Sequence, residues 1–434
     1  METAFVKIWG TTVGAVAWNA ATGYASFEYE PSFRKKGWEL SPFHMSLKDP
    51  KTIFEFPALR KKSDPSLDTF KGLPGLLADM LPDRYGNELM NLWLTQQGRA
   101  PESMNPVELL CFMGNRGMGA LEFEPAIFNE QKQAFSVEID SLVEVARNIM
   151  SQKQAFGTNL KTAETKAIMD IIRIGTSAGG ARPKAVIAYN EQTGAVKSGQ
   201  TKAPSGFEHW LIKLDGVSDV QLGSTKGYGR VEMAYYLMAK DCGISMMPCM
   251  LLEEQGRAHF MTKRFDREGG AIKHHIQSFC ALRHFDYNLV NSFSYEQLFQ
   301  TMRELKLPYS ATEQLFRRMV FNVLARNCDD HTKNFAFRLR QGGTWELAPA
   351  YDICHAYQPQ HQWVSQHALS INGKRTNIQK EDLLAVGKQA NVKYAAAVVE
   401  EVNRAVRQWK TYADAVKVAP DLRDEIADTL IHFS

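Results

Sequence analysis

The sequence predicts an α+β fold with two lobes, one rich in β-strands and one helical. Short stretches of alternating apolar and polar residues, separated by turn residues, recur as far as Phe265. From about residue 290 onward, apolar residues repeat at helical spacing instead. A chain of 434 residues is also longer than one hydrophobic core usually serves, so we expect several domains.

Composition restricts the class of protein. Apolar residues make up 44% of the chain and charged residues 23%, which is typical of a globular protein. The 51 basic and 48 acidic residues nearly balance, so the net charge of +3 identifies no partner. No run approaches the roughly 18 apolar residues that span a bilayer, and the first residues lack a signal-peptide pattern, so we expect a cytoplasmic protein without membrane contact. The six cysteines form no CxxC pair and are expected to be reduced thiols.

Residues 1–130 are expected to form a β-rich N-terminal subdomain. Residues 6–8 and 26–30 alternate in polarity as strands do. The stretch FKGLPGLLADMLPDRYGNELMNLWL predicts helices on either side of Pro82, and the Gly-dense residues 113–125 predict a turn that leads into a strand.

Residues 131–265 are expected to form a second, mainly β-rich domain. Ser141 and Glu144 have capping-box spacing, which predicts a helix start. Further on, IIRIGTSAGGARPKAVIAY places a Gly-rich turn between apolar segments, where backbone N–H groups can approach phosphates because glycine has no Cβ. The turn is neither GxGxxG nor a P-loop, so a plain hairpin turn is the alternative. The candidate nucleotide contacts are Gly175, Ser177, Gly179 and Gly180.

Lys213 lies inside the apolar strand WLIKL, where an unpaired lysine would cost several kcal/mol to bury. Phosphate oxygens and Glu232, on a helix expected near residues 231–242, would pair it; an edge-strand lysine facing water is the alternative. The segment MTKRFDR ends the β-rich part of the chain. Backbone groups at Lys263 and Phe265 are candidates for a hinge that reads adenine.

Residues 266–434 are expected to form a helical lobe, which contains the most informative motif. A helix with a clear apolar stripe is expected from Ser310, with Glu313 completing a capping box. It is followed by NCDDHTKN, in which Asn334 comes five positions after Asp329. This is the spacing of Asp and Asn in the HRDxxxxN catalytic loop of protein kinases.

Residues 335–348 alternate around a Gly-Gly turn, which predicts a hairpin that returns Asp352 to the neighbourhood of Asn334. Phosphoryl transfer needs two metal ligands, a residue that orients or deprotonates the acceptor, and cations over the phosphates. The order of loop, hairpin and second aspartate matches Asp329 as base, followed by the two metal ligands. A solvated loop with a turn-forming aspartate is the alternative, and the spacing of Asp330 to the asparagine does not fit a base.

Taken together, these motifs resemble the HipA-like toxin kinases of bacterial toxin–antitoxin pairs. The matching segments are TSAGGARPK, HWLIKLD, KRFDR, CDDHTKN and APAYDI, in the family's order, and LLADMLPDRYGNE and GNRGMGAL resemble the family's N-terminal domain. The resemblance implies a two-lobed protein-kinase-like fold and an ATP- and Mg²⁺-dependent serine/threonine protein kinase. The chain departs from the usual pattern at Asp330, where glycine is common, and at Arg182 and Pro183.

The resemblance also implies roles for individual residues. Asp329 would be the catalytic base, and Asn334 and Asp352 would hold Mg²⁺. Ser177 would be an autophosphorylation site, whose phosphate would repel nucleotide phosphates. The implied nucleotide contacts are Lys213, which would reach the α- and β-phosphates with Glu232 beside it, His331, Lys333, and the backbone of Lys263 and Phe265.

Members of that family phosphorylate a serine of a protein target, with glutamyl-tRNA synthetase as the known example, and so arrest growth. They also bind a small helix-turn-helix antitoxin, HipB, and the complex occupies operator DNA. Lys374 and Arg375 are therefore candidate DNA contacts, with a solvated surface turn as the alternative.

Three other functions were compared with this hypothesis. A small-molecule kinase would share the DxxxxN loop and the later aspartate, and a non-catalytic transcriptional corepressor would act through antitoxin and DNA alone. A metalloprotease or serine hydrolase fits poorly, because His274 and His275 are adjacent and neither HExxH nor GxSxG occurs.

Overall fold

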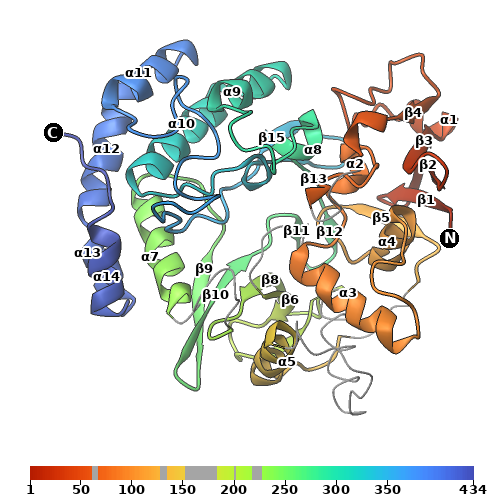
Figure 1. The fold of residues 1–434 in the computed structure, drawn as a ribbon, viewed down its shortest axis with the longest axis horizontal. Coiled ribbons are helices and arrows are strands. Elements are labelled where there is room, and N and C mark those ends of the chain that lie inside the picture. Colours follow the sequence, from red (N-terminus) through yellow and green to blue (C-terminus); the bar gives the residue numbers. More distant parts are fainter. Residues whose placement is uncertain (61–66, 128–133, 152–182, 200–201, 218–226) are drawn as a thin grey trace.

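The structure is a computed structural model. Figure 1 shows the N-terminal sheet and the helical lobe at opposite ends of the molecule, with a second sheet between them along the lower edge of the view. The fold is therefore mixed α and β, with the sheets in the N-terminal regions and most helices in the C-terminal part, as the sequence predicts. The described residues are 1–60, 67–127, 134–151, 183–199, 202–217 and 227–434.

The N-terminal region is built on an antiparallel sheet with strand order β4-β3-β2-β1-β5. In its first strand, Ala4, Val6 and Ile8 are fully buried, which is the alternation of a sheet with one covered face. The two predicted helices on either side of Pro82 are present. The bounds are β1 Thr3–Ile8, β2 Thr11–Asn19, β3 Tyr24–Tyr29, α1 Pro31–Arg34, β4 Ile53–Glu55, the 3-10 turn η1 Pro57–Leu59, α2 Gly75–Ala78, α3 Arg84–Gln96, α4 Pro106–Met113 and β5 Leu121–Glu124.

The second sheet is also antiparallel, with order β7-β6-β8-β10-β9. Its leading helix starts earlier than predicted: the amide of Leu142 donates to the carbonyl of Glu138 at 3.3 Å. Ser141 lies within the first turn, so the capping box predicted there is wrong. The bounds are α5 Ile139–Ser151, β6 Lys184–Tyr189, β7 Val196–Ser198, β8 Glu208–Lys213, α7 Tyr228–Asp241, β9 Cys249–Glu254 and β10 Arg257–Lys263.

Two small sheets join the second sheet to the helical lobe. The predicted hairpin is confirmed: Phe337 pairs with Leu347 and Leu339 with Trp345. Strand β13 pairs with β14 of the same hairpin, so the sheet order is β13-β14-β15. The bounds are β11 Arg267–Glu268, β12 Ile272–Lys273, β13 His275–Ser278, β14 Ala336–Leu339 and β15 Trp345–Leu347.

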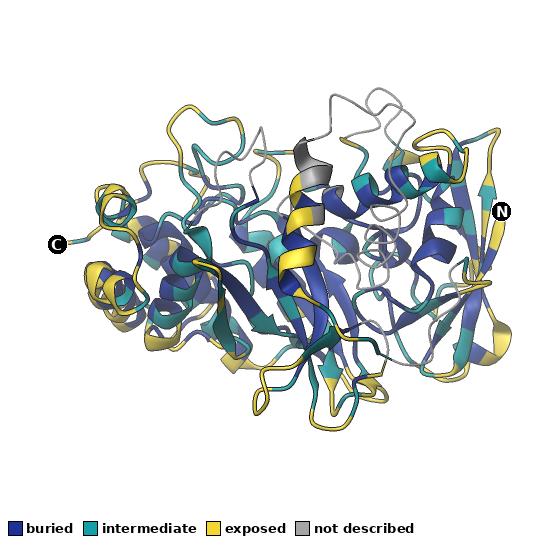
Figure 2. Ribbon diagram, turned by 90° about the horizontal axis from the view of Figure 1, so that it is seen from below, coloured by how far each residue is buried: buried dark blue, intermediate teal, exposed yellow. Residues whose placement is uncertain are grey.

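The helical lobe surrounds α10, whose predicted apolar stripe is fully buried; Figure 2 shows the buried interior in dark blue. The capping box predicted at Ser310 is wrong, because the N-cap is Pro308, which has no side-chain acceptor. A capping box is found instead on α9, between Ser294 and Gln297. The bounds are α8 Phe279–Arg283, α9 Tyr295–Glu304, α10 Tyr309–Leu324, the 3-10 turn η4 Thr332–Asn334, α11 Lys380–Gln389, α12 Ala395–Arg407, α13 Trp409–Ala415 and α14 Pro420–Ala427.

Within the described ranges, no helix combines the length and the apolar character that crossing a bilayer requires.

Candidate active site

The loop after α10 brings Asp329 and Asn334 together. The side-chain amide of Asn334 donates through Nδ2 to the backbone carbonyl of Asp329 at 2.7 Å. This hydrogen bond fixes the rotation of the amide and turns its oxygen, Oδ1, in the opposite direction. The carboxylate of Asp329 is about half exposed, with 49% of its side-chain surface accessible, so an incoming hydroxyl can reach it.

Asp352 returns to this loop at the end of the β14–β15 hairpin. The hydroxyl of the preceding residue, Tyr351, donates to the backbone carbonyl of Lys333 at 2.7 Å, which ties the two segments together. Asp352 has a φ of +56°, a left-handed conformation that is uncommon outside glycine and occurs at functional sites. The predicted return of Asp352 to the loop is thus observed.

Lys213, the last residue of β8, joins the second sheet to this loop. Its ammonium forms ion pairs with Glu232 of α7, as the sequence predicts, and with Asp352. Burial alone would lower the pKa of Lys213, but the two carboxylates hold it above its usual value. Burial would likewise raise the pKa of Asp352, and the positive charges of Lys213 and Lys184 hold it well below its usual range. Lys213 and Asp352 are therefore both charged at neutral pH.

His331 lies beside the predicted base. Its Nδ1 accepts a hydrogen bond from the amide of Lys333 at 3.3 Å, and its Nε2 lies 3.6 Å from a carboxylate oxygen of Asp329. The ammonium of Lys333 lies 4.8 Å from the centre of the Tyr287 ring. Both side chains predicted to contact nucleotide thus belong to the same loop as Asp329.

The side chain of Asp330 points into the helical lobe and is therefore not placed to act as a base. Its carboxylate accepts hydrogen bonds from the Tyr295 hydroxyl at 2.8 Å, from Nδ1 of His367 at 2.9 Å and from the amide of Ala368 at 2.8 Å. Burial would lower the pKa of His367, but the charge of Asp330 raises it to about 10. A buried ion pair therefore holds the residue next to Asp329, and no sequence pattern indicated it.

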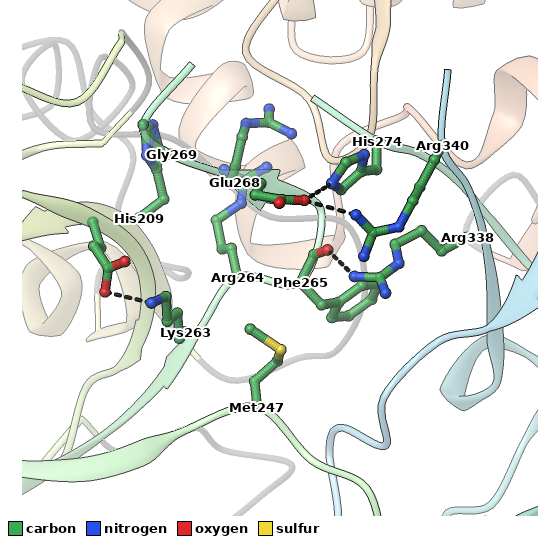
Figure 3. Close-up of a pocket in the computed structure, with 13 residues that line it drawn as sticks. His209, Met247, Lys263, Arg264, Phe265, Glu268, Gly269, His274, Arg338 and Arg340 are labelled. Atoms are coloured by element: carbon green, nitrogen blue, oxygen red, sulfur yellow. Dashed lines mark hydrogen bonds and ion pairs between the residues drawn. The ribbon is translucent and has the colours of Figure 1, made fainter. Parts of the chain in front are cut away.

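The hinge-like segment borders a cavity of about 270 Å³, shown in Figure 3. The amide of Lys263 donates to the carbonyl of Pro248 at 2.9 Å, and the carbonyl of Phe265 accepts from Arg338 at 2.9 Å. The Phe265 ring stacks on that of Tyr351 with the ring centres 5.6 Å apart, so the hinge-like segment contacts the residue before Asp352. The cationic residues that line the cavity are Lys263, Arg264, Arg267, Arg338 and Arg340.

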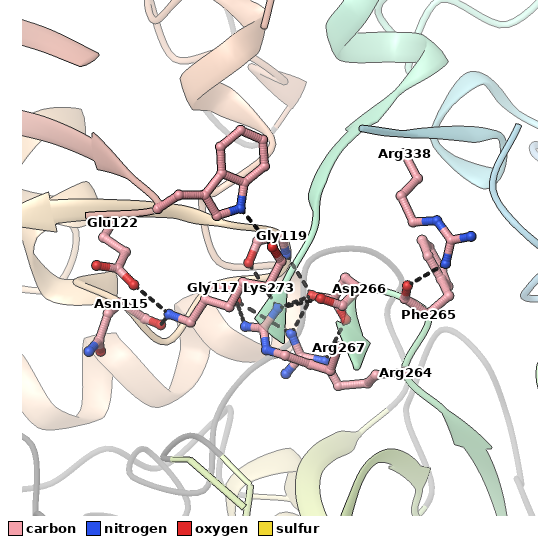
Figure 4. A network of polar contacts seen from close by, with 11 residues as sticks. Asn115, Gly117, Gly119, Glu122, Arg264, Phe265, Asp266, Arg267, Lys273 and Arg338 are labelled. Carbon is pink, nitrogen blue, oxygen red and sulfur yellow. Dashed lines mark hydrogen bonds and ion pairs between the residues drawn. The ribbon is translucent and has the colours of Figure 1, made fainter. Parts of the chain in front are cut away.

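The same segment also anchors the N-terminal region, as Figure 4 shows. The carboxylate of Asp266 is fully buried and accepts hydrogen bonds from Arg264, from Arg267 and from the amide of Gly119 at 2.7 Å. Arg267 donates in turn to the carbonyls of Gly119 at 2.9 Å and Gly117 at 3.2 Å. No sequence pattern indicated this role of the KRFDR motif.

The other predicted site residues are those of the Gly-rich turn and the two candidate DNA contacts. Gly175, Ser177, Gly179 and Gly180 lie outside the described residues. Lys374 pairs with Asp382 at 2.8 Å and keeps 49% of its side chain exposed. The guanidinium of Arg375 donates to the carbonyls of His367, Ala368 and Phe293, so it serves the packing of its own lobe.

These features define a two-lobed, kinase-like protein, and comparisons with known proteins identify its family. The model of the HipA-like C-terminal domain matches residues 176–409, and that of the HipA N-terminal domain matches residues 4–124. The chain belongs to the HipA family, the toxins of toxin–antitoxin systems, which have a kinase-like fold.

A solved structure has the same fold over its whole length. It is that of HipA from Shewanella oneidensis MR-1 in complex with HipB and operator DNA. The alignment covers 99% of this chain and 100% of the Shewanella chain, with a TM-score of 0.67 and 16% sequence identity. The structure of the proinflammatory kinase CtkA of Helicobacter pylori aligns over 51% of this chain and 92% of the CtkA chain. Its sequence identity is 14% and its TM-score 0.31. None of the curated proteins matches the chain significantly.

Proposed function

We propose that this chain is an ATP- and Mg²⁺-dependent serine/threonine protein kinase that acts as the toxin of a toxin–antitoxin pair. The main support is the ion-paired cluster of Lys213, Glu232 and Asp352, next to the loop in which Asn334 is bonded to Asp329. Phosphoryl transfer requires this combination of cation, metal ligands and base. The proposed domains are an N-terminal subdomain of residues 1–130, a kinase N-lobe of residues 131–265 and a kinase C-lobe of residues 266–434.

In the proposed reaction, the hydroxyl oxygen of a serine or threonine attacks the γ-phosphorus of ATP. The bond from this phosphorus to the β–γ bridging oxygen breaks, ADP leaves, and Asp329 accepts the hydroxyl proton. Lys213 balances the negative charge of the α- and β-phosphates. The other proposed nucleotide contacts are His331, Lys333, the backbone of Lys263 and Phe265, and Gly175, Ser177, Gly179 and Gly180.

The residues that would hold Mg²⁺ fit this ion. Mg²⁺ prefers oxygen ligands and in kinases binds through one or two protein side chains together with substrate phosphates. Asp352 supplies a carboxylate that remains ionised, and Asn334 supplies Oδ1, because its Nδ2 is bonded to the carbonyl of Asp329. When bound, Mg²⁺ would neutralise charge that develops on the phosphates.

Regulation and partners are proposed from family membership. Ser177 would be the autophosphorylation site, and the protein target would be an aminoacyl-tRNA synthetase such as the glutamate type. A small HipB-like helix-turn-helix antitoxin would bind the chain and act with it as corepressor on operator DNA, as the partners of the Shewanella protein suggest. Lys374 is the more exposed of the two proposed DNA contacts.

Incubation of the pure protein with labelled ATP and Mg²⁺ tests this proposal. Wild type should acquire label at Ser177, and the Asp329→Ala variant should acquire none. Expression of wild type should arrest growth, and expression of Asp329→Ala should not. ATP binding without any phosphate transfer by wild type would refute the kinase and leave the corepressor, which a gel shift with antitoxin and operator DNA would detect.

A further inference from the structure

Lys184 is a second lysine on the face of the sheet that carries Lys213. The two residues are directly opposite each other in the antiparallel pairing of β6 and β8. Residues opposite each other in adjacent strands project from the same face of a sheet. Only 4% of the Lys184 side chain is exposed, and its positive charge reaches Asp352. Lys184 therefore lies beside the proposed phosphate site.

The partner of Lys184 comes from the N-terminal region. Asp83 precedes α3, and one of its carboxylate oxygens, Oδ1, accepts a hydrogen bond from the amide of Gly86 at 2.7 Å and so caps that helix. The other oxygen, Oδ2, lies 3.7 Å from the ammonium of Lys184 and has no hydrogen-bond partner among the described residues. Only 2% of the Asp83 side chain is exposed. An ion pair protected from water thus connects the N-terminal region to the strand beside Lys213.

Positively charged side chains lie near the Asp83 carboxylate and attract it. Lys184 of β6 and Lys333 of the catalytic loop supply positive charge, and the neutral Tyr85 hydroxyl is buried nearby. Asp79, which follows α2, also lies near the charge of Lys333, and its carboxylate accepts hydrogen bonds from Ser278 at 2.6 and 2.8 Å. The Asp83 carboxylate is therefore the one with an oxygen left for Lys184.

We propose that Asp83 is a positioning residue of the phosphotransfer site, which holds the Lys184 ammonium beside Lys213 as a second cation for the nucleotide phosphates. The inference rests on the proposed kinase function and deepens it. A flexible lysine that is fixed in advance loses less conformational freedom when phosphate binds. The N-terminal region would then be part of the nucleotide site.

The proposal has a pH signature. Burial raises the pKa of Asp83 to about 6, against the opposing charges of Lys184 and Lys333. Protonation removes the charge that holds Lys184. For wild type, the Kd of nucleotide should therefore rise as the pH falls from 7 through 6, beyond the change caused by titration of the nucleotide itself. This additional rise should be absent when residue 83 cannot ionise.

The matched substitution is Asp83→Asn, because asparagine caps helices as well as aspartate does but carries no charge. Equilibrium binding of ADP, followed with a fluorescent analogue, measures nucleotide affinity without phosphate transfer. Asp83→Asn and Lys184→Met should each raise the Kd about tenfold, which corresponds to about 1.4 kcal/mol, and Lys184→Arg should restore most of the affinity. The control is Glu108→Gln, which removes an ion-paired carboxylate of the same region from Arg99 and should leave the Kd unchanged.

A double variant distinguishes positioning from general destabilisation. If Asp83 acts through Lys184, Asp83→Asn/Lys184→Met should bind ADP as Lys184→Met alone does, whereas independent effects would add. Wild-type affinity in either single variant, or additive effects in the double variant, would overturn the inference. The predicted ADP affinities without any phosphate transfer by wild type would refute the kinase and leave the assignment of Asp83 and Lys184 standing.

Discussion

Two buried ion clusters in this molecule have opposite compositions. In the hinge-like segment, residues 263–267, the carboxylate of Asp266 is fully buried between the guanidinium groups of Arg264 and Arg267. At the candidate active site, one ammonium, that of Lys213, is held between Glu232 and Asp352. The hinge carboxylate also accepts a backbone hydrogen bond, whereas 31% of the Asp352 side chain remains exposed.

The two clusters differ in whether their charged groups can accept a further partner. A carboxylate with two arginines and a backbone amide has no capacity for another partner, so the hinge cluster can only connect segments of the chain. A lysine between two carboxylates, one of them partly exposed, could bind phosphate instead if Mg²⁺ were held by the exposed carboxylate. We therefore expect substitutions in the first cluster to affect stability and substitutions in the second to affect phosphate transfer.

The largest effect on stability is expected for Asp266→Asn. It would leave two buried guanidinium groups without a counter-charge, and the free energy of unfolding should fall by about 3–5 kcal/mol. Chemical denaturation measures this loss. The control Asp140→Asn breaks an exposed ion pair with Arg257 and should leave the unfolding curve nearly unchanged. Equal losses in the two variants would contradict the structural role of the hinge cluster.

The same cluster predicts an acid dependence. Burial would raise the pKa of Asp266, but Arg264 and Arg267 hold it far below the ordinary value of 3.8. The stability it provides is therefore complete above pH 4 and is lost as the pH falls below that value. Unfolding curves of wild type and Asp266→Asn should converge as the pH is lowered.

The largest effect on activity is expected for Lys213→Met. Loss of one preorganised cation should lower the rate of phosphate transfer by about 10²–10³-fold. The protein should remain folded, because the carboxylate of Asp352 can be hydrated. The control Lys7→Met removes another strand lysine, paired with Glu124 at 2.5 Å, and should keep the wild-type rate. A Lys213→Met variant that unfolds but transfers phosphate normally would reverse the comparison.

An intermediate effect is expected for His367→Gln, which removes the charge beside Asp330. The rate constant kcat should fall about tenfold with little change in the KM for ATP, because the loop that holds Asp329 loosens, and unfolding should become easier by about 1–3 kcal/mol. Since the folded pKa of His367 is raised to about 10, its stabilisation is complete below pH 6.5 and is lost as the pH rises through 10. This alkaline loss should be absent in His367→Gln and present in the control His432→Gln.

The smallest effect is expected for Lys374→Ala. Its ion pair with Asp382 is half exposed, so the free energy of unfolding should change by less than about 1 kcal/mol and phosphate transfer should not change. If Lys374 contacts a DNA phosphate in the antitoxin complex, the salt dependence of operator binding should weaken by about one unit of slope. An unchanged slope would remove Lys374 from the proposed DNA contacts.

Local patterns predicted the hairpin, the apolar stripe of α10 and the closeness of Asp329 and Asn334, because each depends on residues close together in the chain. Helix starts were less predictable: the capping-box spacing at Ser310 is real, but Pro308 fixes the N-cap two residues earlier. Contacts between distant segments left no pattern in the sequence. Asp83 meets Lys184, and Gly119 meets Asp266, only after the regions have packed together.

The bond from Gly119 to Asp266 limits how far this chain can be shortened. A version that began after the first sheet would lose the amide and the carbonyl groups that Asp266 and Arg267 use, and would open a charged surface at the base of the hinge. Removal of the N-terminal region should thus yield an insoluble or misfolded remainder rather than a minimal kinase.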